Sequence, residues 1–232
     1  MSPLYEKPRI RFAGDRGILV EYGDSIADDI NLKVLSVTHS LDHEPIEGVI
    51  EVVPSYRSLL ILYDPCVVDV GRLIEALNRV EFRAARLIRP EPRLIEIPVC
   101  YGGVFGPDMG VVAALHGLPV EDVVRIHSSV DYRIHMIGFT PGFPFLGGLP
   151  DAIHTPRLEA PRRLVPAGSV GIANNQTGIY PVDSPGGWRI IGRTPLKLFR
   201  PERADPFLYR TGDLIRFVSI DLDEYQLLVE EE

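Results

Sequence analysis

Uncharged polar side chains gather in two loops in the second half of the chain. The stretch 166–181, PAGSVGIANNQTGIYP, combines hydroxyl, amide and phenol groups, and the stretch 183–188, DSPGGW, places two glycines beside the only tryptophan. Donors without charge, aromatic faces and glycines that permit close approach are what a pocket for a small polar ligand requires. Plain barrel corners fit the same composition, so spacing alone leaves both interpretations open.

An apolar segment precedes these loops. Residues 140–150, TPGFPFLGGLP, hold three prolines, three glycines and no charged side chain. The prolines argue against a helix or a central strand, so irregular chain is predicted. Exposing Phe143, Phe145 and Leu146 would forgo about 1.5–3 kcal/mol each, so the segment must lie against the core, a partner or a ligand. Its backbone amides need partners as well.

Other motifs limit the chemistry. The Gly-rich stretch 101–110, YGGVFGPDMG, lacks the GK[ST] ending of a phosphate-binding loop and predicts a turn into a helix, with Pro107 and Asp108 at its start. The histidines do not have metal-ligand spacing, and there is no GxSxG elbow. In IHSSVDY, His127 is interpreted first as part of a helix C-terminus and second as a ligand contact.

The elements that position these loops divide into two halves. In the first half, strand and helix periods alternate in the order β-β-α-β-β-α, which predicts a two-layer α+β domain. In the second half, short apolar strands with dense Pro and Gly predict a barrel or closed sandwich. The predicted first-half elements are strands at 9–12, 17–22, 46–53 and 58–63, and helices around 26–41 and 70–80.

These patterns predict four segments along the chain. Residues 1–83 form the small α+β domain, and 84–92 form a linker, with a basic strip facing a partner as the alternative. Residues 93–220 form the mainly-β domain. Residues 221–232 hold six acids and no base, which predicts a solvating tail.

Composition narrows the classes of partner. The net charge is −8, and most of it comes from residues 221–232. The rest of the chain is nearly neutral, so its charge does not favour binding to nucleic acid or to an anionic membrane. No apolar run reaches the roughly 20 residues of a membrane helix. Cys66 and Cys100 lack a pairing pattern, which favours the reducing cytoplasm.

Several long motifs occur in an order that one family shares. They include IEIPVCYGG, GFTPGFPFLGGLP, PAGSVGIANNQTGIYPVDSPGGWRIIGRTP and the early GDRGILVEYGD, and together they span nearly the whole chain. In these segments the chain resembles the B subunit of the bacterial 5-oxoprolinase complex. This family is also called allophanate hydrolase subunit 1, or is named after an inhibitor of sporulation kinase A.

The resemblance implies a fold, partners and a reaction. The fold is an N-terminal α+β domain followed by a cyclophilin-like β-barrel. The partners are the C subunit of the 5-oxoprolinase complex and, possibly only transiently bound, its LamB/YcsF-type A subunit. Together such proteins open the lactam of 5-oxoproline to glutamate with ATP and Mg²⁺, and the B subunit is expected to be inactive alone. The alternatives are a regulator that inhibits a sporulation-type histidine kinase and a protein related to allophanate hydrolase or urea amidolyase.

Residues and resemblance together yield a candidate binding site without an assigned catalytic base or metal. Arg157, Arg162 and Arg163 are expected to supply positive charge or to form structural ion pairs. Relatives have Gly-Gly where this chain has Asn174-Asn175 after Ala173, which affects close backbone approach to a ligand. The candidate substrate-binding residues are Gly142, Phe143, Arg162, Ser169, Gln176, Thr177, Tyr180, Gly187 and Trp188.

Overall fold

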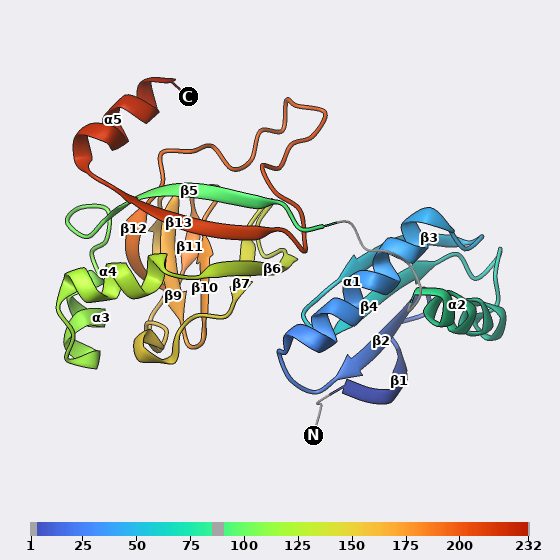
Figure 1. Ribbon diagram of the computed structural model, residues 1–232. Helices are drawn as coiled ribbons and strands as arrows, with labels where there is room; N and C mark the ends of the chain where they lie inside the picture. Colours follow the sequence, from blue (N-terminus) through green and yellow to red (C-terminus); the bar gives the residue numbers. More distant parts are fainter. Residues whose placement is uncertain (1–3, 85–90, 232) are drawn as a thin grey trace. The chain divides into compact units, whose positions relative to one another are not determined.

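The chain folds into two compact units, Met1–Glu91 and Pro92–Glu232 (Figure 1). The computed structural model describes residues 4–84 and 91–231. Most of the predicted linker 84–92, with its alternative as a basic strip, lies outside the described residues. Within the described ranges, no helix combines the length and apolar composition that crossing a membrane requires.

The first unit is a four-stranded antiparallel sheet in the order β1-β2-β4-β3, with two helices packed on it. The predicted β-β-α-β-β-α order is confirmed. Strand β1 begins earlier than predicted because a register shift between Leu4 and Arg9 accommodates Pro8. The elements are β1 Leu4–Phe12, β2 Gly17–Gly23, α1 Asp28–His43, β3 Val49–Pro54, β4 Ser58–Tyr63 and α2 Val70–Ala84.

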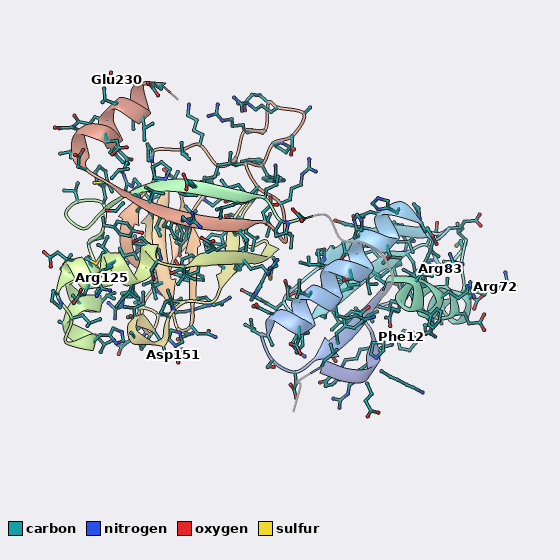
Figure 2. All side chains as sticks on the ribbon, viewed as in Figure 1. Phe12, Arg72, Arg83, Arg125, Asp151 and Glu230 are labelled. Atoms are coloured by element: carbon teal, nitrogen blue, oxygen red, sulfur yellow. The ribbon has the colours of Figure 1, made fainter. Side chains whose placement is uncertain are left out.

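The core of this unit follows from its two periodicities. Alternate residues of β2 and β4, such as Ile18 and Ile61, face the helices, and Val34 of α1 and Leu73 of α2 complete the apolar layer. The outer surface of α2 carries charged side chains such as Arg83, which projects from the helix (Figure 2) and pairs with Glu44 of the segment after α1. Helix α2 therefore has one apolar face and one solvated face.

The second unit is a closed barrel of seven strands in the order β10-β7-β6-β13-β5-β12-β9. Strands β11 and β8 form a separate two-stranded sheet. The barrel interior is filled by apolar side chains such as Ile97, Tyr132, Ile172 and Phe217. The elements are β5 Leu94–Tyr101, α3 Met109–His116, α4 Val120–Ser128, β6 Asp131–Ile137, β7 Pro144–Gly147, the 3₁₀ turn Asp151–Ile153, β8 Arg162–Val165, β9 Ser169–Ala173, β10 Gln176–Ile179, β11 Ser184–Gly186, β12 Arg189–Arg193, β13 Leu214–Ile220 and α5 Leu222–Glu231.

One prediction about the apolar segment 140–150 was wrong. Residues 144–147 form strand β7, which lies in the barrel wall between β6 and β10. Pro144 is tolerated because it is the first residue of the strand, where no ladder hydrogen bond from its nitrogen is needed. The segment thus satisfies its backbone by pairing with its neighbours, as a buried segment must.

Two further segments differ from expectation. Residues 196–199, one of the short apolar stretches expected to be strands, contribute only an isolated bridge between Phe199 and Phe207, next to a hydrogen bond from Leu208 N–H to Leu198 C=O at 3.2 Å. The acidic segment 221–232 was interpreted as a tail, yet Leu222–Glu231 is helix α5. None of its described residues is buried, and its ring contact is Tyr225 against Phe105 at 4.4 Å between centroids.

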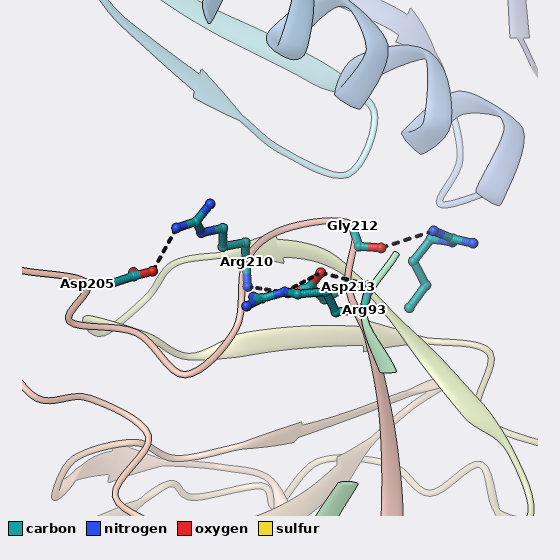
Figure 3. Close-up of polar contacts among 6 residues, drawn as sticks. Arg93, Asp205, Arg210, Gly212 and Asp213 are labelled. Carbon is teal, nitrogen blue, oxygen red and sulfur yellow. Dashed lines mark hydrogen bonds and ion pairs between the residues drawn. The ribbon is translucent and has the colours of Figure 1, made fainter. Parts of the chain in front are cut away.

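A network of ion pairs and hydrogen bonds lies where the chain enters the barrel at the start of β5 (Figure 3). The Asp213 carboxylate accepts hydrogen bonds from the Arg93 guanidinium at 3.1 Å and from the Arg210 backbone N–H at 2.9 Å. Arg210 also pairs with Asp205 at 2.7 Å. The network joins the start of β5 to the turn before β13, where the parallel register pairs Leu94 with Leu214.

Candidate functional site

An aromatic cluster lies at one corner of the barrel and unites three of the candidate residues. The ring of Phe143 is 5.0 Å from that of Tyr180 and 5.3 Å from that of Trp188, both edge-on. All three side chains are buried, and Val165 and Ala173 pack beside them. Loops that are far apart in sequence therefore converge, as the pocket hypothesis requires, although the three rings also fill a small core of their own.

The chain before Phe143 turns tightly and is strained. Thr140 N–H donates to Gly138 C=O at 2.9 Å, which makes Phe139 the centre of a three-residue γ-turn. Phe139 has φ 69°, the rare left-handed form of this turn. The residue is 65% exposed, and its ring touches that of Phe143 edge-on. Phe139 was not among the predicted site residues, and only its position after Gly138 hinted at a special backbone.

Gly142 is placed by close contacts. Its φ is +85°, and a Cβ atom there would lie 3.2 Å from the Phe207 ring. Its carbonyl accepts a hydrogen bond from the Tyr209 hydroxyl at 2.8 Å. Gly142 therefore anchors the apolar segment to the loop 199–209, and its carbonyl already has a partner within the protein.

A buried carboxylate organises the arginines beside the aromatic cluster. Asp108 accepts from Arg162 Nη2 at 2.7 Å and from the Ile190 N–H at 2.6 Å. Arg189 Nη1 lies 4.0 Å from the same carboxylate. Arg162 thus has the structural ion pair that was one of its two expected roles. The predicted turn into helix α3 is present, but the Asp108 side chain binds strand β12 rather than capping the helix.

Arg157 differs from Arg162 because its charge is not neutralised. Its guanidinium lies over the Trp188 ring at 5.8 Å from the centroid. It is exposed and has no ion pair with any residue that the structure describes. Burial raises the pKa of the nearby Tyr180 phenol, and a hydrogen bond with the Trp188 backbone and the charges of Arg157 and Arg162 partly offset that effect. This corner therefore presents a free cation at the surface, over a buried indole and a buried, neutral phenol. Arg163 is exposed.

Thr177 belongs to a closed polar chain inside the barrel. Its Oγ1 donates to Gly171 C=O at 3.0 Å and accepts from His127 Nε2–H at 2.8 Å. The other ring nitrogen of His127 accepts from the Tyr101 hydroxyl at 2.8 Å. His127 is fully buried and stacks on Phe217, and burial lowers its pKa to about 3. His127 is therefore a neutral interior residue, and its interpretation as a ligand contact was wrong.

The remaining candidates lie along the same strands. Ser169 is fully buried, and its hydroxyl has no hydrogen-bond partner among the described residues. Gln176, 7% exposed, opens β10 directly after the turn. The Gly187 carbonyl accepts from Leu158 N–H at 2.7 Å, which brings residues 157 and 158 next to Trp188.

The Asn-Asn turn lines a hollow next to this corner. Asn174 adopts φ 53°, a left-handed backbone conformation that asparagine tolerates better than most residues. Its N–H donates to Thr155 C=O at 2.7 Å. A hollow of about 300 Å³ is lined by His154, Thr155 and Pro156 on one side and by Asn174 and Asn175 on the other. Within the described part of the chain, no three His, Cys, Asp or Glu side chains come close enough to hold a metal ion.

Comparison with known proteins assigns the chain to a family. Residues 8–209 match the family described as carboxyltransferase domain, subdomain C and D, and the barrel with its α+β unit belongs to that class. The chain is 42% identical to the 5-oxoprolinase B subunit of Bacillus subtilis, over 96% of this chain and 97% of that protein. It is 44% identical to the Haemophilus influenzae B subunit, over 74% and 80% of the two chains. The chain belongs to the family of 5-oxoprolinase B subunits.

Solved structures agree with this assignment. A conserved uncharacterized protein of Pyrococcus horikoshii, PH0987, is 47% identical over 94% of this chain and 100% of its own, with a TM-score of 0.56. A structure of TTHA0988 gives a TM-score of 0.79 at 38% identity over 89% of this chain, and this chain spans 40% of its length. The Kluyveromyces lactis urea carboxylase, at 21% identity and a TM-score of 0.76, shares the fold over 24% of its own chain.

Proposed function

We propose that this chain is the B subunit of a cytoplasmic, ATP-dependent 5-oxoprolinase that opens 5-oxoproline to glutamate. The observation that carries the proposal is the 42% identity to a protein named as a 5-oxoprolinase B subunit, across nearly the full length of both chains. Its companions are the C subunit, with which it forms the lactam-activating unit, and the LamB/YcsF-type A subunit. The chain is inactive alone and supplies part of a site that the complex completes.

The corner around Trp188 is the substrate-binding part of this chain. 5-Oxoproline carries one carboxylate and one flat amide ring. Arg157 offers an unpaired cation for the carboxylate, and it is held over the ring of the buried Trp188. The Tyr180 phenol is 1% exposed, and burial raises its pKa, so it is a neutral group inside the cluster that supports Trp188.

The requirement for ATP follows from the stability of the lactam. An amide carbonyl is a poor electrophile, and transfer of a phosphoryl group to its oxygen makes its carbon a better one. Water adds to that carbon and the C–N bond breaks with release of the amine, after which a second water displaces phosphate from the resulting acyl phosphate to leave glutamate. Such a step needs cations near the phosphates, and ATP with Mg²⁺ supplies the phosphoryl group when bound. Arg162 and Arg189 lie together at this corner, but Asp108 already compensates their charge. Arg157 is therefore the residue of this corner that fits an anionic group.

The γ-turn at Phe139 fits a surface that the C subunit covers. A phenylalanine that is held in a strained backbone and exposes 65% of its surface forgoes hydrophobic free energy in the isolated chain. Exposed aromatic side chains are characteristic anchors of protein interfaces. Because Phe139 touches Phe143, a partner that covers it also closes the aromatic corner.

Co-expression with the C and A subunits tests the proposal. ATP hydrolysis by the assembled complex is expected to rise when 5-oxoproline is added, with glutamate as the product. Arg157→Gln is expected to raise the KM for 5-oxoproline at least about tenfold, the size expected for loss of one charged hydrogen bond. Arg163→Gln, which removes the same charge from an exposed neighbour, is the matched control.

Two outcomes would contradict different parts of the proposal. Unchanged kinetics of Arg157→Gln would remove this corner from the substrate site. If 5-oxoproline does not stimulate ATP hydrolysis by the complex, the proposed 5-oxoprolinase activity is wrong. Gln176→Ala is expected to abolish coupled turnover without preventing assembly of the complex. Normal turnover in this variant would show that the β9–β10 loop is not part of the substrate site.

A urea-related reaction is the second candidate, because the chain also matches urea amidolyases. It is 26% identical to the Lachancea kluyveri enzyme over 99% of this chain and 14% of that protein. The lower identity favours the lactam. Urea and allophanate in place of 5-oxoproline in the same ATP assay separate the two, since each candidate predicts stimulation by its own substrate alone.

A further inference from the structure

The first unit contains a groove that the proposed reaction does not use. It lies between strand β1 and helix α2, with α1 also contributing, and encloses about 620 Å³. This volume is within the usual range for small-molecule pockets, about 300–1,000 Å³. The charged side chains Lys7, Lys33 and Glu81 line it together with the apolar Ile10 and Ile74. Glu6, Asn78 and the exposed Phe82 also lie along it.

Glu81 is a half-buried carboxylate without a counter-ion. Its Oε1 accepts a hydrogen bond from the Tyr22 hydroxyl at 2.8 Å. No ion pair within 4 Å joins Glu81 to another residue in the described ranges, and burial raises the pKa of its carboxyl. By contrast, the more buried Glu21 of the same unit pairs with Arg11 at 2.6 Å and with Arg57 at 3.1 Å. Glu81 therefore retains an unused acceptor oxygen.

Lys33 is the opposite charge in the same groove, and it has no ion pair with any residue that the structure describes. It is half-buried, and its Nζ lies 5.9 Å from the centroid of the Tyr22 ring, which already binds Glu81 through its hydroxyl. Lys33 influences Glu81 through space but makes no direct ion pair with it. The chain has 21 arginines and only three lysines. Two of these three lysines, Lys7 and Lys33, line this groove. Lysine is a compact charge that suits a small ligand.

We propose that this groove binds a free α-amino acid with an apolar side chain. The ammonium of the ligand meets Glu81, and its carboxylate meets Lys33, with Lys7 nearby. Ile10 and Ile74 contact its side chain. A simple anion would face Glu81, and a simple cation would face Lys33, so neither satisfies both groups. A zwitterion does, because its two charges are fixed a short distance apart.

Calorimetric titration of the full chain tests this assignment. Leucine is the probe, and N-acetyl-leucine and leucinamide each lack one of its two charges. Leucine is expected to bind at least about tenfold more tightly than either analogue, since each loses a charged contact in the groove. Glu81→Gln and Lys33→Gln are each expected to weaken leucine binding by a similar factor.

Matched variants separate the groove from general charge effects. Glu75→Gln removes an exposed carboxylate from the same helix, and Lys197→Gln removes the lysine that lies outside the groove; neither is expected to change the affinity. Circular dichroism confirms that each variant is folded. The assignment is overturned if leucine and other apolar amino acids do not bind in the millimolar range, if either analogue binds as well as leucine, or if both groove variants bind normally. The readout is binding, so its failure leaves the lactam proposal untouched.

Discussion

The interior of the barrel and its aromatic corner treat polar groups in opposite ways. Inside, Tyr101, His127 and Thr177 form a chain in which each donor meets an acceptor and the last hydrogen bond ends on a backbone carbonyl. At the corner, Arg157 has no counter-ion among the described residues, and Phe139 is exposed in a strained turn. The polar chain from Tyr101 to Thr177 is therefore complete in the isolated protein, whereas the corner is suited to something that binds to it.

The largest expected effect comes from breaking the interior chain. His127→Leu leaves the Tyr101 hydroxyl and Thr177 Oγ1 without this partner in a buried site. Two lost buried hydrogen bonds predict a decrease of about 3–5 kcal/mol in the free energy of unfolding of the second unit. Urea denaturation measures it, and His43→Ala, an exposed site in the first unit, is the control. A loss below about 1 kcal/mol would show that the chain of hydrogen bonds is not a stabilising unit.

The same histidine predicts a dependence of stability on pH. The pKa of His127 is about 3 in the folded protein, against 6.5 for an unperturbed histidine. Between about pH 6.5 and pH 3, His127 is therefore protonated in the unfolded chain but neutral in the folded protein. This stability is fully present above pH 6.5 and is lost as the pH falls toward 3, by up to about 1.4 kcal/mol per pH unit.

Denaturation curves across this pH range provide the measurement. The part of the slope that comes from His127 is expected to be missing in His127→Leu. Equal slopes in the two proteins would mean that His127 is protonated in the folded state. That result would break the contrast between a neutral interior and a charged corner.

The smallest stability effect is expected at the corner, where it has the opposite sign. Asparagine accepts the left-handed backbone more readily than phenylalanine, so Phe139→Asn is expected to stabilise the isolated chain by about 1 kcal/mol. The same change is expected to weaken association with the C subunit at least about tenfold, because an interface anchor is lost. Thermal unfolding and pull-down with the C subunit measure the two effects.

Phe82→Asn is the control for Phe139, since it replaces another exposed phenylalanine, in the first unit. It is expected to leave association with the C subunit unchanged. If Phe139→Asn leaves association intact, the partner does not cover this turn. If it destabilises the isolated chain, the turn is not under strain.

Much of the fold was predictable because local patterns agree with it. The helical spacing of Ile30, Val34, Val37 and Leu41 marked helix α1, and alternation in β2 and β4 marked the centre of the first sheet. Phe143, Tyr180 and Trp188 were predicted to line a pocket, and the structure brings their rings together in a buried cluster. Strand β7 was not predicted, because proline content disfavours a strand locally while barrel closure favours one.

The sequence by itself determined the order of elements, the apolar faces that build two cores, and the family, because these depend on neighbours along the chain. Only the tertiary structure decided which charged side chains have a counter-ion. It placed Arg162 against Asp108, 54 residues away in sequence, and left Arg157 over Trp188. It also enclosed His127 of helix α4, whose partner Thr177 lies 50 residues away in sequence on strand β10. Pairing and burial are contacts in space, and residue types alone do not specify them.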